Sequence, residues 1–300
     1  MDWFFYSLTT SILISVITVF SKVIITKHVN TPFVYIFAIG VIHILHHIFV
    51  LPWLIGADYP FIPSVIAFLS GVSMAVYVMI QFVAMKYFDM SRLVPVLTTY
   101  PIFVAILSQL FLGENIALFA WISILVAVCG AGLVSFGPSE SGKGALTIRL
   151  TLSLLLASFF FALAQFLVKF ISDDIQIWPQ SLIRSFGEIS VLGVLVFLPK
   201  VRSGFVDLIT TPKSLSLYLF AEGFLAGITL ICFYSAIYAA DVYLVSAVLI
   251  TRPLFVFVLG LIMSLPFFNV LSEGTRGKSL IYRLLGTILT VLGVGGVILL

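Results

Sequence analysis

Long apolar runs alternate with short polar breaks along the whole chain. About 20 consecutive apolar residues are enough to cross a bilayer as an α-helix, and the pattern predicts ten such helices. The breaks between them consist of turn-forming residues, as at 30–32 and 113–115. The predicted spans are 3–26, 33–55, 62–83, 92–112, 116–136, 149–171, 179–199, 213–238, 243–265 and 281–300.

The composition indicates that lipid surrounds most of this protein. The 300 residues are 62% hydrophobic and 9% charged, whereas about a quarter of the residues in a soluble domain are charged. We therefore expect an all-α integral membrane protein with ten transmembrane helices, located in the inner or plasma membrane of the cell. No basic run of the kind that binds nucleic acid is present, so we expect no nucleic-acid partner.

The positive charges predict an orientation. Most of the 15 Lys and Arg residues flank the odd-numbered loops, for example Lys27, Lys86 and Arg276. Cytoplasmic loops carry an excess of such residues. The charges therefore place the odd-numbered loops in the cytoplasm and both termini outside.

The two halves of the chain are similar in sequence. Residues 84–101 align with 236–253, and a second block aligns residues near 22–52 with those near 169–199. Because each half holds five spans, the second copy enters the membrane from the opposite side. Such inverted repeats are typical of secondary transporters that work by alternating access. The matched pairs include Asp89 and Asp241, Pro101 and Pro253, Lys22 and Lys169, and Gly40 and Gly187.

The segment "FVAMKYFDMSRLVPVLTTYPIFVAILSQLFLGEN" at 82–115 resembles the fourth-span signature of EamA-type transporters, in the drug/metabolite transporter superfamily. The glycine-rich stretches at 127–136 and 291–299 are similar to the closing spans of that family. The resemblance implies two five-helix repeats, which we place at 1–137 and 149–300 with a connecting loop at 138–148. It also implies cytoplasmic termini, opposite to the orientation that the charges predict.

Arg252 is the first candidate for substrate binding. It precedes Pro253 in the ninth span, and its repeat partner Tyr100 precedes Pro101 in the fourth. A proline interrupts the hydrogen bonding of a helix, and interrupted spans at matching positions point to a transporter's binding site. We expect Arg252 and Tyr100 to contact the substrate; alternatively, Arg252 pairs with a buried glutamate.

Four other ionisable residues lie within predicted spans, where a charge is costly. Arg184 and Glu188 share one helix face, which suggests either a self-contained ion pair or an Arg184 that faces a cavity and is oriented by Glu188. Glu222 either carries a proton or neutralises Arg252. His43, which lies close to His46 and His47 in the second span, is a cavity-lining group, a proton relay or a packed core residue.

Two intramembrane arginines favour an anionic or zwitterionic ligand. We therefore expect a secondary transporter for a small polar metabolite, such as an amino acid or a carboxylate, with a coupling ion or proton. The alternative is a flippase for a lipid or lipid-linked substrate. We expect no enzyme, cofactor or metal site, because no catalytic triad, Cys–His spacing or phosphate-binding glycine loop occurs. A monomer and a homodimer are both compatible with the sequence.

Overall fold

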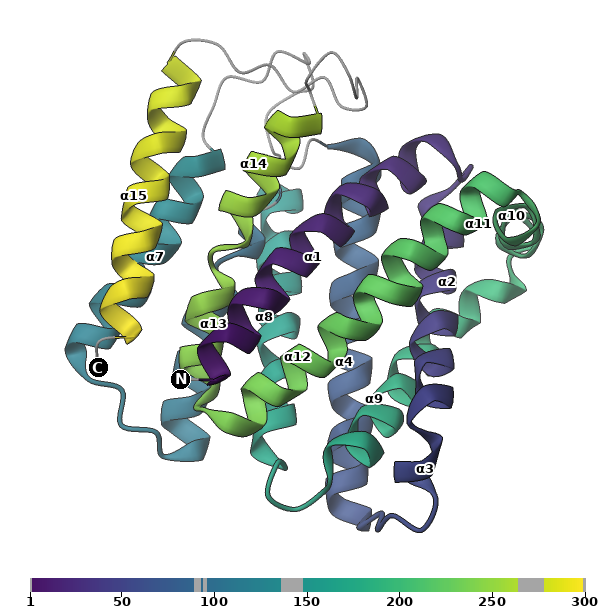
Figure 1. Cartoon of the computed structure of the whole chain (residues 1–300), viewed down its shortest axis with the longest axis horizontal. Coiled ribbons are helices and arrows are strands. Elements are labelled where there is room, and N and C mark those ends of the chain that lie inside the picture. Colours follow the sequence, from purple (N-terminus) through teal and green to yellow (C-terminus); the bar gives the residue numbers. More distant parts are fainter. Residues whose placement is uncertain (1, 89–92, 94–95, 136–147, 264–277, 299–300) are drawn as a thin grey trace.

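The computed structural model describes residues 2–88, 93, 96–135, 148–263 and 278–298, and most of these residues are helical, with no β-strand among them (Figure 1). The helices are α1 (Asp2–Lys27), α2 (Pro32–Leu45), α3 (Leu51–Leu54), α4 (Phe61–Tyr87), α6 (Tyr100–Leu107), α7 (Leu118–Ser135), α8 (Ile148–Phe170), α9 (Ile177–Leu192), α10 (Pro199–Thr210), α11 (Pro212–Tyr218), α12 (Ala226–Ala239), α13 (Val242–Leu249), α14 (Arg252–Met263) and α15 (Lys278–Ile298). Helices α2 and α9 continue into the tighter 3₁₀ turns η1 (His46–Val50) and η3 (Gly193–Phe197). Helices α6 and α11 continue into the wider π-helical turns η2 (Ser108–Leu112) and η4 (Leu219–Leu225).

Six helical stretches are long and apolar enough to cross a membrane. They are Asp2–Lys27, Pro32–Leu54, Phe61–Tyr87, Ile148–Phe170, Ile177–Phe197 and Pro212–Ala239. Shorter apolar helices cover Tyr100–Leu112, Leu118–Leu133, Val242–Val256 and Leu285–Val297. All of these stretches coincide with predicted spans, so the chain is an all-helical, multi-pass membrane protein. That the four shorter helices also cross the bilayer stays a prediction.

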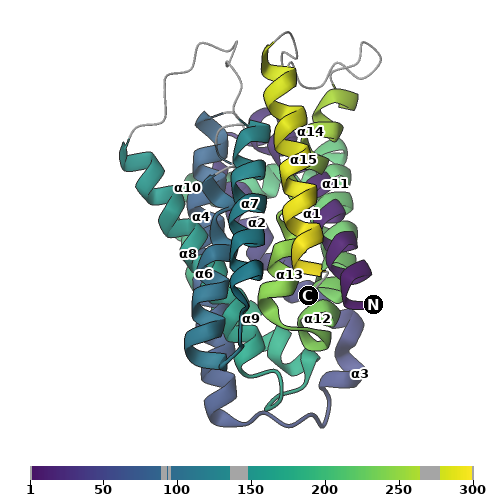
Figure 2. The same ribbon diagram turned by 90° about the vertical axis from the view of Figure 1, so that its left-hand side faces the viewer.

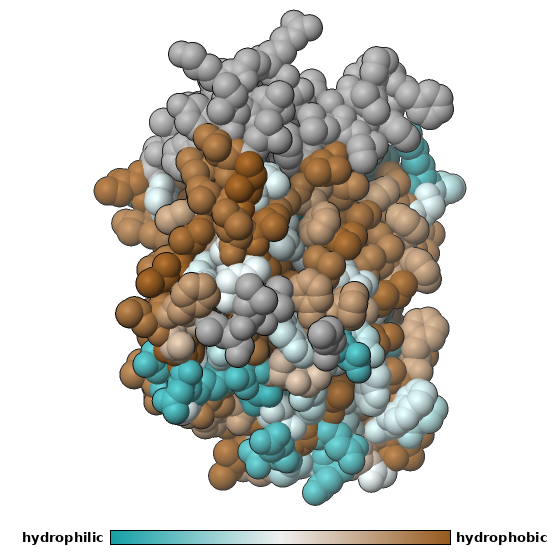
Figure 3. Space-filling model, turned by 60° about the vertical axis from the view of Figure 1, so that its left-hand side comes forward, coloured by the Kyte–Doolittle hydropathy of each residue, from teal (hydrophilic) through white to brown (hydrophobic). Residues whose placement is uncertain are grey.

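The outer surface of the bundle is apolar. Phe61 and Phe197 expose 81% and 83% of their surface, and Leu118 exposes 75%. Figure 3 shows hydrophobic side chains over most of one face, with hydrophilic ones gathered toward its lower end. A soluble monomer rarely exposes apolar area on this scale, so this surface is suited to lipid.

The fourth and ninth predicted spans are interrupted at equivalent positions. Residues 98–99 form a turn directly before α6, and residues 250–251 form a turn directly before α14. Pro101 and Pro253 each occupy the second position of the helix that follows, where the missing N–H of a proline costs little. The matched irregularity predicted from the prolines is therefore confirmed. Asp89, from the same alignment, lies outside the described residues.

Helix contacts between the halves occur in matched pairs. Helix α4 packs against α8, and its counterpart α12 packs against α1. Helix α6 likewise contacts α8, while its counterpart α14 contacts α1. Helices α7 and α15 pack side by side at one edge of the bundle (Figures 1 and 2). Helices that the sequence alignment pairs thus make equivalent contacts across the two halves.

Lys22 and Lys169, which the alignment pairs, make the same kind of contact. The ammonium of Lys22 donates to the carbonyl oxygens of Met85 and Phe88, at the end of α4. The ammonium of Lys169 donates to the carbonyl oxygen of Ile237, near the end of α12, at 3.1 Å. The last carbonyls of a helix lack partners and carry partial negative charge. Lys22 therefore connects α1 to the end of α4, and Lys169 connects α8 to the end of α12. In each half the two helices are the first and third predicted spans.

Helix α10 was not predicted. The seventh span was expected to continue to residue 199, but η3 ends at Phe197 and a new helix begins at Pro199. A proline fits the first turn of a helix, and Val201 and Leu208 bury one face of this helix. Its polar residues Lys200 and Arg202 were interpreted as loop charges. The helix is short and amphipathic, so hydropathy alone did not reveal it.

Candidate functional site

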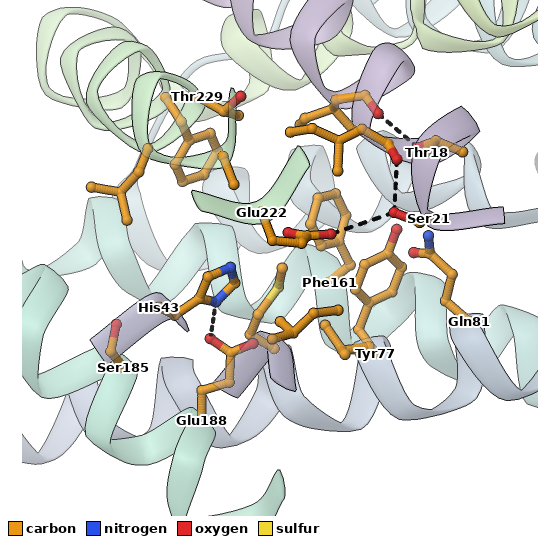
Figure 4. A pocket seen from close by; sticks show the side chains of 18 of the residues that line it. Thr18, Ser21, His43, Tyr77, Gln81, Phe161, Ser185, Glu188, Glu222 and Thr229 are labelled. Carbon is orange, nitrogen blue, oxygen red and sulfur yellow. Dashed lines mark hydrogen bonds and ion pairs between the residues drawn. The ribbon is translucent and has the colours of Figure 1, made fainter. Parts of the chain in front are cut away.

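A cavity of about 190 Å³ opens among the helices of both halves. Helices α1, α2, α4, α8, α9, α12 and α14 contribute to its wall, together with η4. Figure 4 shows its polar side chains directed into a common space, with Tyr77 and Phe161 beside them. The cavity brings together all but one of the residues predicted to bind substrate: His43, Arg184, Glu188, Glu222 and Arg252.

Arg252 lies at the first position of α14, directly after the turn at 250–251. Its Nη2 donates to Thr18 Oγ1 at 2.8 Å, and its Nη1 donates to Tyr77 OH at 3.3 Å. Its Nε is buried and has no partner within the protein. The alternative in which Arg252 pairs with Glu222 or Glu188 is therefore wrong, because neutral hydroxyl groups hold the guanidinium.

Tyr100 lies beside the main cavity. It lines a smaller pocket whose wall includes Phe161, Tyr77 and Arg252, which also line the main cavity. Its hydroxyl donates to the carbonyl oxygen of Ser246 at 3.3 Å, and its ring meets Phe161 edge to face, with 4.7 Å between centroids. Substrate contact by Tyr100 stays a prediction. In this structure the side chain supports the aromatic wall.

Arg184 and Glu188 do not form the self-contained ion pair that was one of the two interpretations of their spacing. Glu188 Oε2 instead lies 2.8 Å from His43 Nδ1, so the carboxylate bridges α9 to α2. The guanidinium of Arg184 lies over the ring of Phe233, 5.7 Å from its centroid. Both side chains line the cavity because they lie on the same helix face. The carboxylate of Glu188, however, pairs with His43 of α2 and not with Arg184.

Glu222 lies within η4, next to Gly223. It is 4% exposed, and its Oε1 accepts hydrogen bonds from Tyr35 OH and from Ser21 Oγ, the latter at 3.4 Å. A π-helical turn shifts the side chains that follow it around the helix axis, and such turns are frequent at functional sites. The turn thus accompanies a carboxylate held by two neutral donors.

His46 and His47 are packed residues and do not line the cavity. His46 Nε2 lies 2.9 Å from the carbonyl oxygen of Gly223, and His47 Nε2 lies 2.9 Å from Ser181 Oγ. Within the described residues, no cluster of three or more potential metal ligands forms. Of the histidines in this span, His43 is therefore the candidate functional residue.

Helices α4 and α9 approach each other closely at two glycines, Gly71 and Gly187. A Cβ atom at Gly71 would lie 1.8 Å from the carbonyl oxygen of Arg184, and one at Gly187 would lie 2.1 Å from that of Phe68. The repeat partner of Gly71 is Gly223, where an added Cβ would meet nothing closer than 3.7 Å. The helices are therefore tightly packed at Gly71, which we call the closed contact. They are loosely packed at its counterpart Gly223, which we call the open contact.

Sequence reasoning missed Thr18, Ser21 and Tyr35, which hold the buried charges. The first two belong to a set of buried hydroxyl residues on α1, most of which lie three or four positions apart. That period keeps them on one helix face. A polar seam on an apolar span was thus the signal that could have found them. The set is Ser7, Thr10, Ser11, Ser15, Thr18 and Ser21.

Residues 1–136 match the sequence model of the EamA-like transporter family. A solved structure, described as "Crystal structure of protein", matches with a TM-score of 0.70 and 14% sequence identity, covering 98% of this chain and 96% of that chain. At this identity the likeness shows the fold alone. No curated protein matches the chain. The family match over residues 1–136, together with the apolar helices, is consistent with an EamA-type membrane transporter of the drug/metabolite transporter superfamily.

Proposed function

We propose that this protein is a secondary active transporter for a small anionic or zwitterionic solute, such as a carboxylate or an amino acid. One observation carries the proposal. Arg184 and Arg252 both line the cavity, and neither has a carboxylate within 4.0 Å in the described part of the chain, where the ion pair is that of His43 with Glu188.

An unpaired guanidinium inside a membrane is costly. Two nitrogens of Arg252 donate to the neutral hydroxyl groups of Thr18 and Tyr77, and its Nε has no partner within the protein. A carboxylate or phosphate fits the planar donor set of arginine and makes stronger, charge-assisted bonds. An anionic group on the solute would therefore offset the cost of placing these guanidinium groups inside the membrane. The glutamates Glu188 and Glu222 are already hydrogen-bonded, which leaves the guanidinium groups as the primary contacts.

Alternating access is the mechanism that the packing supports best. The closed contact at Gly71 and its open counterpart at Gly223 are what an inverted repeat produces in one of its two end states. Exchange of the two arrangements would close the helices around Gly223 and open those around Gly71. The matched contacts of α4 with α8 and of α12 with α1 support the same two-repeat arrangement.

Transport by purified protein in liposomes tests the proposal. Arg252→Gln keeps a hydrogen-bonding side chain but removes the charge, and we expect a loss of about tenfold or more in uptake of labelled carboxylates and amino acids. Arg202→Gln on α10 is the matched control, because Arg202 is exposed and lies outside the cavity. Undiminished uptake in Arg252→Gln would remove this residue from the site.

The flippase alternative is tested in the same liposomes. A fluorescent headgroup-labelled lipid replaces the solute, and a membrane-impermeant quencher reports its movement between leaflets. Lipid translocation that requires Arg252, without uptake of any soluble anion, would favour the flippase.

A further inference from the structure

His43, Glu188 and Glu222 come from three different elements, α2, α9 and η4, and meet on the cavity wall. His43 Nδ1 lies 2.8 Å from Glu188 Oε2. Figure 4 shows the Glu188 carboxylate below the imidazole ring and the Glu222 carboxylate to its side, and both carboxylates interact with the ring electrostatically. The arrangement is a chain of carboxylate, imidazole and carboxylate, which we name the acid–base cluster.

Each member has room for a change in protonation. The Glu188 Oε1 atom is buried and has no partner, so it can accept a proton without losing a hydrogen bond. The partners of Glu222 are the hydroxyl groups of Tyr35 and Ser21. Ser21 can accept a hydrogen bond as well as donate one, so the site accommodates a carboxylate or a carboxylic acid. His43 titrates near neutral pH when unperturbed.

The charges around the cluster decide what a proton does to the cavity. With His43 neutral and both glutamates ionised, two negative charges balance the guanidinium charges of Arg184 and Arg252. One added proton makes the cavity positive by one charge, and two make it positive by two. The titratable and charged groups that surround the cluster are Tyr35, His46 and His47 on its own helical span, Tyr77, Arg184, Tyr218, Tyr234 and Arg252.

We propose that the acid–base cluster is the binding site of a coupling proton, and that the protein carries an anion and a proton together. The proposal rests on the function proposed above, because the anion is the solute of the guanidinium groups. A proton enters the cluster from water on one side and leaves to water on the other. A monoanion with one proton then crosses without net charge. By linkage, the anion raises proton affinity by the same factor as the proton raises anion affinity.

Infrared spectroscopy tests the proton site without any substrate. Wild-type protein in lipid is titrated from about pH 8 to pH 5, the range in which imidazole changes its charge. We expect a buried carboxylic-acid band that appears on acidification and shifts in heavy water. The band must be lost in Glu222→Gln or in Glu188→Gln. If no such band appears, or if it survives in both variants, the proposal is wrong.

Proton flux tests the coupling. Liposomes loaded with a pH-sensitive dye receive labelled succinate or glutamate on the outside, and anion uptake and internal acidification are recorded together. We expect His43→Gln to lower the acidification by about tenfold. The control is His28→Gln, because the imidazole of His28 is also hydrogen-bonded to a side chain, that of Ser214, but lies outside the cavity.

The outcomes separate the two proposals. Anion uptake by the wild type without proton movement leaves the transport function in place and overturns the coupling. If neither anion is transported, the anion-transport function fails for these probes, and the infrared titration alone decides the proton site. Size-exclusion profiles that match the wild type show which variants are folded, and Glu188→Gln and Glu222→Gln give two independent chances of a folded variant.

Discussion

The backbone carbonyl of Arg184 lies against Gly71, so close that a methyl carbon at position 71 would be 1.8 Å from the carbonyl oxygen. The side chain of the same arginine lines the cavity. A backbone contact between α4 and α9 and a guanidinium at the candidate site are thus joined in one residue. Movement at this helix contact must change the position of the charge.

Gly71→Ala should therefore disrupt the closed contact. Overpacking of this kind costs about 1–3 kcal/mol, and we expect a lower unfolding temperature in detergent and reduced transport. Gly132→Ala is the matched control, because Gly132 is also helical and an added Cβ there meets nothing within 4 Å. Equal unfolding temperatures for the two variants would contradict the close contact.

Thr18→Val removes the shorter of the two hydrogen bonds of the Arg252 guanidinium. The loss of a hydrogen bond to a charged group costs about 1.5–3 kcal/mol, and a misplaced guanidinium should raise the KM for an anion about tenfold with a smaller effect on kcat. Thr10→Val is the control, because Thr10 is equally buried in α1 and bonds only to the carbonyl of Tyr6. A similar change in both variants would show a general effect of hydroxyl removal.

Glu114 lies outside the predicted spans and provides a pH-dependent prediction. Burial, and after it the nearby Asp241, raises the pKa of its carboxyl from 4.5 to about 6. The folded state then holds this proton more tightly than the unfolded state. Stability from this group is fully present below about pH 4.5 and decreases as the pH rises to about 6. The size is about 1 kcal/mol after allowance for solvent screening.

Unfolding temperatures measured between those pH values test the effect. Glu114→Gln should remove the decline, and Asp241→Asn should reduce it, because the second cause of the raised pKa is gone. Asp58→Asn, in the loop between α3 and α4, serves as the control. If the unfolding temperature of Glu114→Gln still falls by the same amount as the pH rises, another group is responsible for the effect.

Lys169→Met keeps the length of the side chain but removes the hydrogen bond to the Ile237 carbonyl. We expect a loss of about 1–3 kcal/mol, because a helix-terminal carbonyl is left without its charged donor. The repeat predicts that Lys22→Met lowers the unfolding temperature in the same direction. Lys200→Met on α10 is the control and should have little effect. A stable Lys169→Met protein would contradict the structural role of the bond.

Hydropathy predicted the helical class and the places of the apolar helices because a bilayer imposes one length and one polarity on every span. The repeat also predicted a detail that hydropathy misses, the paired turns before Pro101 and Pro253. It could do so because a proline constrains the backbone locally, whatever surrounds it. Helix α10 escaped prediction since short amphipathic helices resemble loops in a hydropathy profile.

The candidate site was predictable in its members but not in its pairing. The cost of burying a charge selected Arg184, Glu188 and Arg252, and all of them line the cavity. Sequence spacing suggested that Arg184 pairs with Glu188, but His43 of another helix takes the carboxylate. Pairing depends on which helices face each other, and that information is tertiary. Tyr100 lines the neighbouring small pocket, and its contact with substrate stays a prediction.

The lysine contacts have a mechanical consequence. Lys22 joins α1 to α4 near their carboxyl ends, and Lys169 joins α8 to α12 near theirs. Figure 1 shows the carboxyl ends of α1 and α4 at one end of the bundle and those of α8 and α12 toward the other. In the alternating-access cycle proposed above, each lysine would hold one end of its helix pair together while the other end separates. Because the two contacts lie at opposite ends of the bundle, the two pairs would separate toward opposite ends.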